Sequence, residues 1–314
     1  MAKKEIRGVV AILTKYAPCD PDGAFDESTF RSYIRWVLKK GVHVVAFNAG
    51  ADFDYNDAER RRLAEIILEE VNGRVPTIIG AQGWDTETCL KRAKEIEKMG
   101  ADVVFITGPP TTRPLSGNPK DIVEHFKRVS DAISAPISFY NTPGGWPGIM
   151  GPDLIKMIKK AAPNVTYMKA GEREFQEYVK VFNGLADSGI KIIAGKSYYN
   201  FHQLHYGWDK PNRPVGVSGY LTAVIPAEHV AMWNAFEKND IDKAREIWYG
   251  KILPLAILIY GREFGYNEAT FPNEVLKQMG IFKHARIPFT IVGPDEYTKK
   301  EIAKYIEQCK PDIG

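Results

Sequence analysis

The sequence predicts an α/β protein, a (β/α)8 TIM barrel over residues 1–224 with a C-terminal helical extension over residues 225–314. Short apolar runs of strand length alternate with longer segments of helical periodicity through about two-thirds of the chain. Such runs are typical of parallel strands that are buried on both faces. Eight of these βα units match a closed barrel of about 200–250 residues. After about residue 222 the strand signal stops, and only helical patterns follow.

The predicted strands are mostly rich in valine and isoleucine, and most are closed by Gly, Pro, Asn or Ser. They span residues 8–14, 42–48, 75–81, 101–107, 136–141, 165–169, 190–195 and 214–218. Helical spacing between them is clear at residues 59–68, where Asn56 or Asp57 can cap the helix. Residues 20–26 and 207–213 are rich in Pro, Gly, Asp and Asn, which predicts surface loops.

The extension is predicted to consist of helices separated by turn signals. The helical segments are residues 227–237, 241–260, 273–279 and 298–309, and they are interrupted at residues 238–240 and 286–288. These helices could cover one side of the barrel or build a subunit interface.

Composition and charge argue against several classes of protein. A formal net charge of +3 over 314 residues favours neither nucleic acid nor a membrane surface as a partner. No apolar run is long enough to span a bilayer, and residues 1–7 contain no apolar stretch that could serve as a signal peptide. The three cysteines are odd in number and far apart, so we expect reduced thiols in a cytoplasmic protein.

A lysine ends the sixth predicted strand, in the run Val-Thr-Tyr-Met-Lys-Ala-Gly at residues 165–171. A charged amine withdrawn from water is destabilised, so burial lowers its pKa from about 10.4 toward neutrality. The free amine is then a nucleophile that can form a Schiff base. We therefore take Lys169 as the candidate catalytic lysine. The alternative is an ordinary lysine whose head emerges at the strand tip and reaches water.

The fifth predicted strand ends in Phe-Tyr-Asn-Thr-Pro at residues 139–143. Active sites of (β/α)8 barrels lie at the carboxyl ends of the strands, so adjacent strands should place Tyr140 beside Lys169. A phenol next to a reactive amine can shuttle the protons that form and collapse a carbinolamine. The alternative is a packed aromatic ring with a hydrogen-bonded hydroxyl.

The Tyr-Asn-x-Pro motif at residues 140–143, followed by Met-Lys-Ala at residues 168–170, resembles the dihydrodipicolinate synthase / N-acetylneuraminate lyase family. The resemblance covers nearly the whole chain, which would be an atypical member. It implies a metal-independent class I lyase, without a cofactor, that forms a Schiff base with pyruvate or a related 2-keto acid. It also implies a homo-oligomer, a dimer or a homotetramer. By position, Lys169 matches the imine lysine of the family and Tyr140 matches its proton-relay tyrosine.

The end of the second predicted strand departs from the family pattern. The family usually has Gly-Thr-Thr-Gly-Glu there, whereas this chain has Asn48-Ala49-Gly50-Ala51-Asp52. The threonine hydroxyls that would help to hold a keto-acid carboxylate are therefore missing. The backbone N–H groups of Ala49 and Gly50 can still form a small anion nest, and the amide of Asn48 can assist.

The loop after the fourth predicted strand lacks the second tyrosine that the family uses near its relay, and reads Gly-Pro-Pro-Thr-Thr at residues 108–112. Either the relay is not needed, or it is rebuilt from water, Thr111, Thr112 or Ser218, which lies at the end of the eighth strand.

Lys196 stands just past the seventh predicted strand and is expected next to Lys169. A second cation there would lower the pKa of the imine lysine further. It could also bind a distal carboxylate or phosphate, because the last two loops of such barrels often bind phosphate. Asp52 and Glu172 are possible partners of Lys196, and either could supply acid–base steps in a dehydratase. The alternative is a solvent-exposed loop lysine.

After the Tyr-Asn-x-Pro motif, the lysine-biosynthesis enzymes of this family carry an arginine that grips a second carboxylate. This chain has Gly-Gly-Trp-Pro at residues 144–147 instead. Losing the arginine removes a bidentate anion clamp, and Trp146, like Trp84, offers a surface on which an acceptor could stack. The sequence therefore argues against aspartate semialdehyde, and so against the lysine-pathway synthase. The alternative is that Trp146 only packs its loop.

The sequence thus favours a Schiff-base lyase acting on pyruvate or a 2-keto-3-deoxy sugar acid, by aldol cleavage or condensation or by dehydration. A second aldehyde or sugar-derived substrate would complete the reaction. The alternative function is a family relative with reduced catalysis that senses a keto acid or sugar acid, since the strand-two motif is eroded. No metal is predicted, because His202 and His205 have no third ligand at a matching spacing. The predicted site residues are Lys169 and Tyr140 for catalysis, and Asn48, Ala49, Gly50, Asp52, Trp146, Lys196 and Ser218 for substrate binding.

Overall fold

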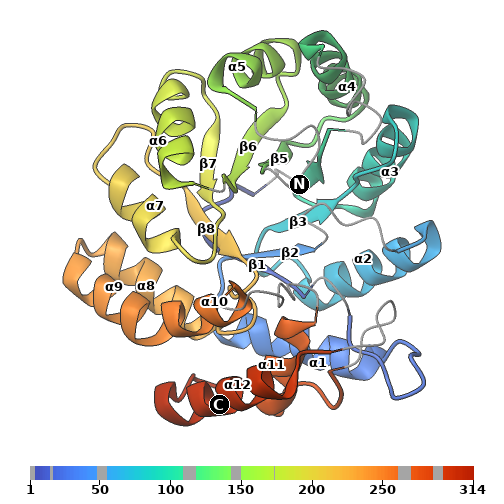
Figure 1. Cartoon of the computed structure of the whole chain (residues 1–314). Helices are drawn as coiled ribbons and strands as arrows, with labels where there is room; N and C mark the ends of the chain where they lie inside the picture. Colours follow the sequence, from blue (N-terminus) through green and yellow to red (C-terminus); the bar gives the residue numbers. More distant parts are fainter. Residues whose placement is uncertain are drawn as a thin grey trace.

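The structure, a computed structural model, describes residues 4–14, 17–47, 55–108, 118–142, 150–172, 174–260, 270–285 and 293–314. Within these residues, eight parallel strands close into a barrel in chain order, and β8 pairs with β1 (Figure 1). The predicted fold class is therefore confirmed. The strands are β1 (Gly8–Ile12), β2 (Val44–Phe47), β3 (Thr77–Gly80), β4 (Val103–Ile106), β5 (Ile137–Asn141), β6 (Val165–Ala170), β7 (Lys191–Ala194) and β8 (Gly216–Gly219).

A helix follows each strand and lies on the outside of the barrel (Figure 1). These helices are α1 (Glu27–Lys39), α2 (Asp57–Val71), α3 (Thr86–Met99), α4 (Pro119–Ala132), α5 (Pro152–Ala161), α6 (Phe175–Gly184), α7 (Asn200–Gly207) and α8 (Pro226–Glu237). Of the two residues that could cap α2, the cap is Asn56. Its side chain accepts a hydrogen bond from the Glu59 backbone, and the Glu59 carboxylate accepts one from the Asn56 backbone. This reciprocal pair satisfies two backbone donors at the helix start.

The apolar core has two layers, because alternate residues of each strand face opposite sides. One layer fills the interior of the barrel and includes Val10, Phe105, Tyr140 and Ile193. The larger layer lies between the strands and the helices. On β5, Phe139 belongs to the outer layer and packs against Phe126 of α4, with ring centroids 5.7 Å apart. The next residue, Tyr140, therefore faces the interior.

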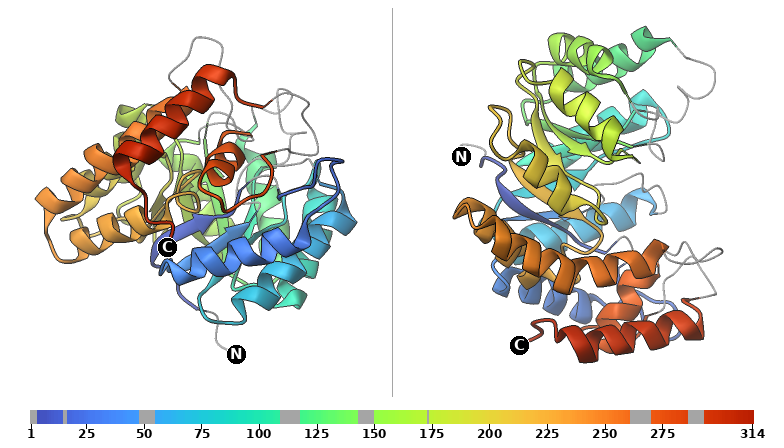
Figure 2. Two further views of the ribbon diagram at one scale, coloured as in Figure 1. Left: turned by 90° about the horizontal axis from the view of Figure 1, so that it is seen from below. Right: turned by 60° about the vertical axis from the view of Figure 1, so that its left-hand side comes forward.

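The extension contains α9 (Ile241–Ile247), a π-helical turn η2 (Trp248–Ile252), α10 (Leu253–Tyr260), α11 (Phe271–Gln278) and α12 (Glu296–Cys309). The helix predicted over residues 241–260 is thus a continuous helical path with a π-turn at its middle. Figure 2 shows α12 running along the outside of the molecule. The described residues contain no helix with both the length and the apolar character of a membrane span.

The extension covers the side of the barrel formed by α1 and α8. Phe282, which follows α11, packs edge-on against Tyr33 of α1 with ring centroids 5.1 Å apart. The last residues continue this contact, since the Lys40 amine lies 2.6 Å from the Asp312 carboxylate and the Asp312 backbone N–H donates to Glu228 of α8 at 2.9 Å. The predicted division into units at residue 224 stays a prediction.

Candidate active site

Lys169 and Tyr140 meet at the carboxyl end of the barrel, where β6 and β5 pair residue for residue. The Lys169 Nζ atom lies 4.0 Å from the centroid of the Tyr140 ring. Both side chains are buried, with 7% and 8% of their surface exposed. The amine therefore lies against the ring of the phenol, and the catalytic roles of both residues stay predictions.

Two glycines at the strand ends leave room for this pair, and a third leaves room for Ser197. A Cβ atom on Gly171 would lie 2.1 Å from Cε2 of Tyr140, and one on Gly195 would lie 2.6 Å from Cγ of Lys169. A Cβ on Gly219 would meet the Ser197 hydroxyl at 2.2 Å. Such separations are far inside van der Waals contact, so each position excludes any other residue unless its neighbours move.

A small cavity of about 10 Å³ lies inside the barrel against Lys169. Two serine side chains, Ser138 of β5 and Ser218 of β8, line it together with the lysine, and both serines are 1% exposed. The remaining lining is apolar, from Val10, Ile12, Ile78, Phe105 and Ile193. This volume is close to the minimum that holds one water molecule, and three polar groups are enough to bind it. Ser218 thus lines the same cavity as Lys169, and its role in the site stays a prediction; Ser138 was not predicted.

A carboxyl group lies just past β6. Glu172 is fully buried, and its Oε1 accepts a hydrogen bond of 2.9 Å from Nδ2 of Asn141, the residue after Tyr140. Burial raises the pKa of this carboxyl to about 7, against the opposing hydrogen bond from Asn141. The Glu172 backbone carbonyl accepts a hydrogen bond from the hydroxyl of Tyr199. Glu172 was considered from the sequence as a partner of Lys196, but its contact with Asn141 was not foreseen.

The loop after β7 brings Lys196 and Tyr199 to the same end of the barrel. The Lys196 amine lies 5.1 Å from the centroid of the Tyr198 ring. Lys196 is half-buried, which is intermediate between the two predicted alternatives, a residue of the site and a solvent-exposed loop lysine. Its role therefore stays a prediction. Burial, followed by the nearby Glu172, Tyr198 and Tyr140, raises the pKa of Tyr199 above its ordinary value. Tyr199 was not predicted as a site residue.

Several predicted site residues lie outside the described part of the chain. They are Asn48, Ala49, Gly50, Asp52 and Trp146, together with Thr111 and Thr112 of the candidate relay. Trp84, the other tryptophan proposed to stack on an acceptor, follows β3 and is 57% exposed.

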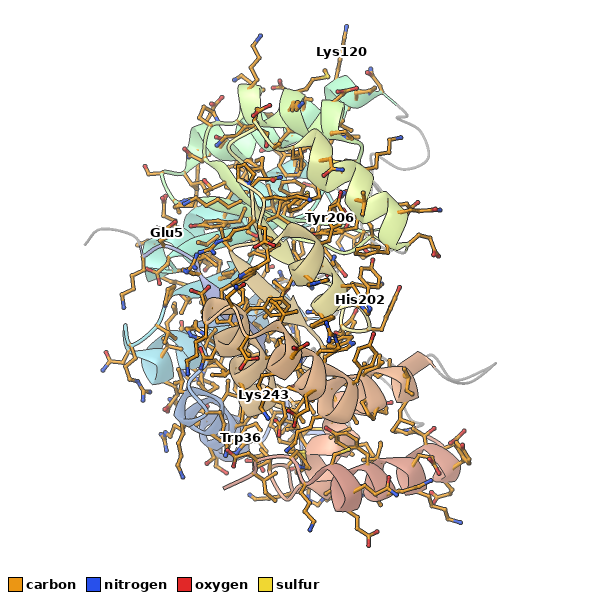
Figure 3. The ribbon with its side chains drawn as sticks, turned by 90° about the vertical axis from the view of Figure 1, so that its left-hand side faces the viewer. Glu5, Trp36, Lys120, His202, Tyr206 and Lys243 are labelled. Carbon is orange, nitrogen blue, oxygen red and sulfur yellow. The ribbon has the colours of Figure 1, made fainter. Side chains whose placement is uncertain are left out.

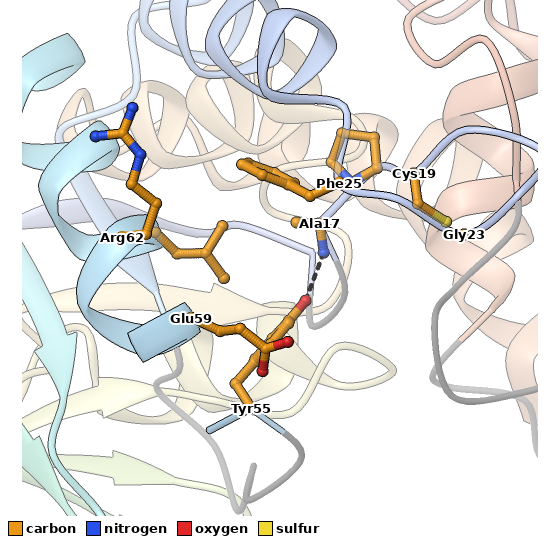
Figure 4. Close-up of a pocket in the computed structure, with 9 residues that line it drawn as sticks. Ala17, Cys19, Gly23, Phe25, Tyr55, Glu59 and Arg62 are labelled. Atoms are coloured by element: carbon orange, nitrogen blue, oxygen red, sulfur yellow. Dashed lines mark hydrogen bonds between the residues drawn. The ribbon is translucent and has the colours of Figure 1, made fainter. Parts of the chain in front are cut away.

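A larger pocket, of about 180 Å³, lies away from Lys169, between the loop after β1 and the start of α2 (Figure 4). Its walls are mainly apolar, and the Tyr55 hydroxyl in it accepts a 2.8 Å hydrogen bond from the Ala17 backbone. The two charged residues that line it are already engaged, Glu59 in the capping box of α2 and Arg62 with Glu27. The pocket therefore offers no reactive group comparable to Lys169.

The two histidines of α7 are packed among aromatic rings, and Figure 3 shows His202 beside Tyr206 of the same helix. The His202 ring meets Phe175 and Trp248 edge-on at 6.3 and 6.2 Å, and His205 stacks on Phe201 at 5.6 Å. Across the described ranges, no group of three or more His, Cys, Asp or Glu side chains could hold a metal ion. Independence from metal stays a prediction.

Comparison with known proteins adds the family context. A sequence model of the dihydrodipicolinate synthetase family matches residues 6–308. The 4-hydroxy-tetrahydrodipicolinate synthase of Syntrophobacter fumaroxidans is 27% identical over 249 residues, which are 79% of this chain and 80% of that protein. The enzyme of the same name from Thermotoga neapolitana is 30% identical over 254 residues, 79% of this chain and 82% of that protein.

Solved structures show the same fold. YagE, a prophage protein of E. coli K12 in the dihydrodipicolinic acid synthase family, was solved in complex with pyruvate. It superimposes with a TM-score of 0.83 at 19% identity, and the match covers 97% of this chain and 99% of the YagE chain. Dihydrodipicolinate synthase from Thermotoga maritima gives a TM-score of 0.83 at 22% identity, with 97% and 98% coverage. At such identities the likeness concerns the fold.

Proposed function

Since the chain belongs to the dihydrodipicolinate synthetase family, we propose that it is a lyase that binds pyruvate or a related 2-keto acid as an imine on Lys169. The observation that supports this most is the contact between the buried Lys169 amine and the Tyr140 ring, 4.0 Å apart. Lys169 is buried, and burying an amine is unfavourable, so a buried amine at the carboxyl end of a barrel is a candidate for chemistry.

The proposed reaction begins when the Lys169 amine attacks the ketone carbon of the keto acid. The carbinolamine loses water, and the protonated imine then accepts electrons from the bond that changes next. In an aldol reaction, the bond that breaks or forms joins the carbon next to the imine carbon to the carbon after it. In a dehydration, a hydroxyl group leaves as water. We assign the movement of protons to Tyr140 in both cases, because its phenol ring lies against the reacting amine.

For the second substrate we propose a sugar-derived or aromatic acceptor in place of aspartate semialdehyde. The relatives described above are named 4-hydroxy-tetrahydrodipicolinate synthases. This chain has Gly-Gly-Trp-Pro at residues 144–147, where the family resemblance implies an arginine in the lysine-pathway enzymes. Without the arginine, a second carboxylate loses a bidentate partner. We also propose a homo-oligomer, a dimer or tetramer, although a monomeric variant of dihydrodipicolinate synthase has been solved among the structural neighbours.

Reductive trapping tests the imine. The protein is treated with borohydride in the presence of pyruvate and then with a panel of 2-keto-3-deoxy sugar acids, and the modified peptide is mapped by mass spectrometry. We expect the adduct on Lys169 and its complete loss in Lys169→Ala. Lys156→Ala, on the exposed face of α5, is the matched control that still traps. An adduct that persists in Lys169→Ala would make another lysine the nucleophile.

A second candidate function is a sensor that binds a keto acid or sugar acid without turnover. The sequence at residues 48–52 favours it, because the family's threonine pair is absent there. A sensor would also trap pyruvate, so turnover decides between the two. Cleavage, condensation or dehydration of any acid in the panel, at a rate that Lys169→Ala abolishes, supports the lyase. Trapping without any turnover supports the sensor.

A further inference from the structure

Glu172 is a buried carboxyl group beside the imine site that the proposed reaction leaves without a task. Its side chain is fully buried, three residues after Lys169. Oε1 is bonded to the Asn141 amide at 2.9 Å, while Oε2 is buried and, among the described residues, has no hydrogen-bond partner. An ionised carboxylate held in this way would lose most of its hydration without gaining a bonded cation, which is unfavourable. The folded chain therefore favours the neutral carboxyl.

Asn141, the partner of Glu172, connects three segments around Tyr140. Its Nδ2 donates to Glu172 Oε1 and to the Met150 carbonyl at 3.2 Å, while its Oδ1 accepts from the Met150 backbone N–H at 2.7 Å. The Asn141 carbonyl accepts a 2.9 Å hydrogen bond from Gly171, the residue on which the Tyr140 ring lies. Only one orientation of the amide satisfies all these partners, because a flipped amide would direct an NH₂ group at the Met150 N–H.

We propose that Glu172 is a positioning residue of the imine site: its neutral carboxyl fixes the Asn141 amide, and through it the end of β5 that holds Tyr140 against Lys169. Removing the carboxyl leaves one buried N–H of Asn141 without an acceptor. The amide can then rotate, and the end of β5 and the chain at Met150 lose a shared anchor. This inference rests on the proposed function, because it assigns the role of Glu172 to the reaction at Lys169.

Ionisation of Glu172 should disturb the same anchor. The Asn141 hydrogen bond favours the ionised form, but a buried charge whose Oε2 has no partner among the described residues favours movement of the carboxylate toward water. The groups that face it are Asn141 from β5, Glu177 and Tyr178 from α6, Lys196 after β7 and Tyr199 at the start of α7. Glu177 opposes the ionised form and Lys196 favours it, while burial raises the pKa of Glu172 to about 7. Burial also holds the pKa values of Tyr178 and Tyr199 above their ordinary value, so both phenols stay neutral in this range. Of Glu172, Tyr178 and Tyr199, Glu172 is thus the one that changes charge near pH 7.

The test uses Glu172→Gln, which keeps an acceptor for Asn141 but cannot ionise, and Glu172→Ala, which removes the acceptor. Glu124→Gln, on the exposed face of α4, is the matched control for the loss of a carboxylate. For each protein, kcat and KM are measured from pH 5.5 to 8.5 with a turned-over 2-keto acid, and trapping on Lys169 is measured in parallel. We expect Glu172→Ala to lower kcat about tenfold with a smaller change in KM. At pH 6, Glu172→Gln should have the kcat of the wild type, which Glu172→Ala lacks. We expect the kcat of the wild type to decline near pH 7 and the kcat of Glu172→Gln to show no such decline.

Wild-type kcat in Glu172→Ala, or an unchanged pH profile in Glu172→Gln, would overturn the inference. Failure of the proposed function gives a different result, because the wild type itself would then trap no keto acid. In that case crystal structures decide the positioning role. A Tyr140 ring and an Asn141 amide that stay unchanged in Glu172→Ala would overturn it, whereas a rotated amide that Glu172→Gln returns to its place would support it.

Discussion

The contact between Lys169 and Tyr140 depends on a single register between two strands. Tyr140 pairs with Lys169 across β5 and β6, and strand alternation turns both side chains into the barrel. A shift of one residue in either strand would turn one of them toward the helices. The chemistry proposed for this protein therefore depends on the same hydrogen bonds that build the barrel.

Tyr140→Phe isolates the hydroxyl from the ring. We expect kcat to fall by about a hundredfold or more, the contribution typical of a positioned proton donor. The ring still packs on Gly171 and beside the lysine, so the thermal unfolding midpoint should stay within a few degrees of the wild type. Steady-state kinetics and a thermal melt check both statements. Unchanged kcat would remove Tyr140 from the proton relay.

Glu172 makes stability depend on pH in a defined window. The pKa of its carboxyl is raised from the ordinary 4.5 to about 7 in the folded chain, so folding favours the protonated form. Its contribution to stability is fully present below pH 4.5, declines as pH rises toward 7, and is absent above that. A shift of this size corresponds to about 3 kcal/mol.

Denaturant unfolding at several pH values checks this expectation. The free energy of unfolding of the wild type, relative to Glu172→Gln, should fall by a few kcal/mol between pH 4.5 and 7.5. The glutamine variant does not titrate, so it provides the reference at every pH. A constant difference between the two proteins would mean that Glu172 is ionised in the folded state with an ordinary pKa.

Single residues also show where sequence reasoning ends. Lys169 and Tyr140 could be predicted because each interrupts or closes an apolar strand with a chemical group. Ser138 lies within an apolar run, and Tyr199 lies in an aromatic segment, Tyr198–Trp208, that reads as a helix. They belong to the candidate site because of their neighbours in space. Ser138 lines the cavity against Lys169, and the Tyr199 hydroxyl bonds to the carbonyl of Glu172. Such proximity is a property of the closed fold and leaves no local pattern in the chain.

At the scale of elements, the strands were predictable because a barrel strand is buried on both faces and reads as an apolar run. The π-turn η2 was not, because a helical pattern continues through residues 241–260, and Gly250 and Pro254 signal a weakened helix without specifying a π-turn. A π-turn changes the number of residues per turn locally, so the positions that contact the core shift from one side of it to the other. The end of each strand, in contrast, is marked by the residues that the site needs.

The glycine that ends β6 is predicted to be indispensable for the site. In Gly171→Ala the new Cβ would lie 2.1 Å from the Tyr140 ring, so the ring must leave its place over Lys169. We expect kcat to fall at least tenfold and the free energy of unfolding to fall by about 1–3 kcal/mol. Kinetics and denaturant unfolding measure the two effects.

Gly250→Ala is the control for this substitution. Among the residues that the structure describes, nothing lies within 4 Å of a Cβ at Gly250, and alanine is favoured over glycine in helical segments. This variant should keep full activity and equal or greater stability. If Gly171→Ala behaves in the same way as Gly250→Ala, the end of β6 is more adaptable than the packing indicates, and the Tyr140 ring is held by other contacts.

At the scale of the whole molecule, the extension and the barrel share buried contacts that a separable unit would lack. The Lys40 side chain at the end of α1 is 4% exposed, and its amine is paired with Asp312 at 2.6 Å. Tyr33 of α1 packs on Phe282, and Glu228 of α8 binds the Asp312 backbone. These contacts tie the last residues of the described chain to helices on both sides of β1. We therefore expect the barrel and the extension to unfold together, in one cooperative transition.

Asp312→Ala tests this coupling, because it removes the partner of a buried amine while altering only the extension. Asp312 is itself 62% exposed, so we expect a loss of about 1 kcal/mol, seen as a shift of the entire urea curve with an unchanged slope. Asp242→Ala removes an exposed partner of Arg245 within α9 and should shift the curve by much less. Circular dichroism and the fluorescence of the tryptophans should report the same midpoint in each protein. Two separate transitions, with only the first sensitive to Asp312→Ala, would show that residues 225–314 form an independent unit, as the sequence division at residue 224 allows.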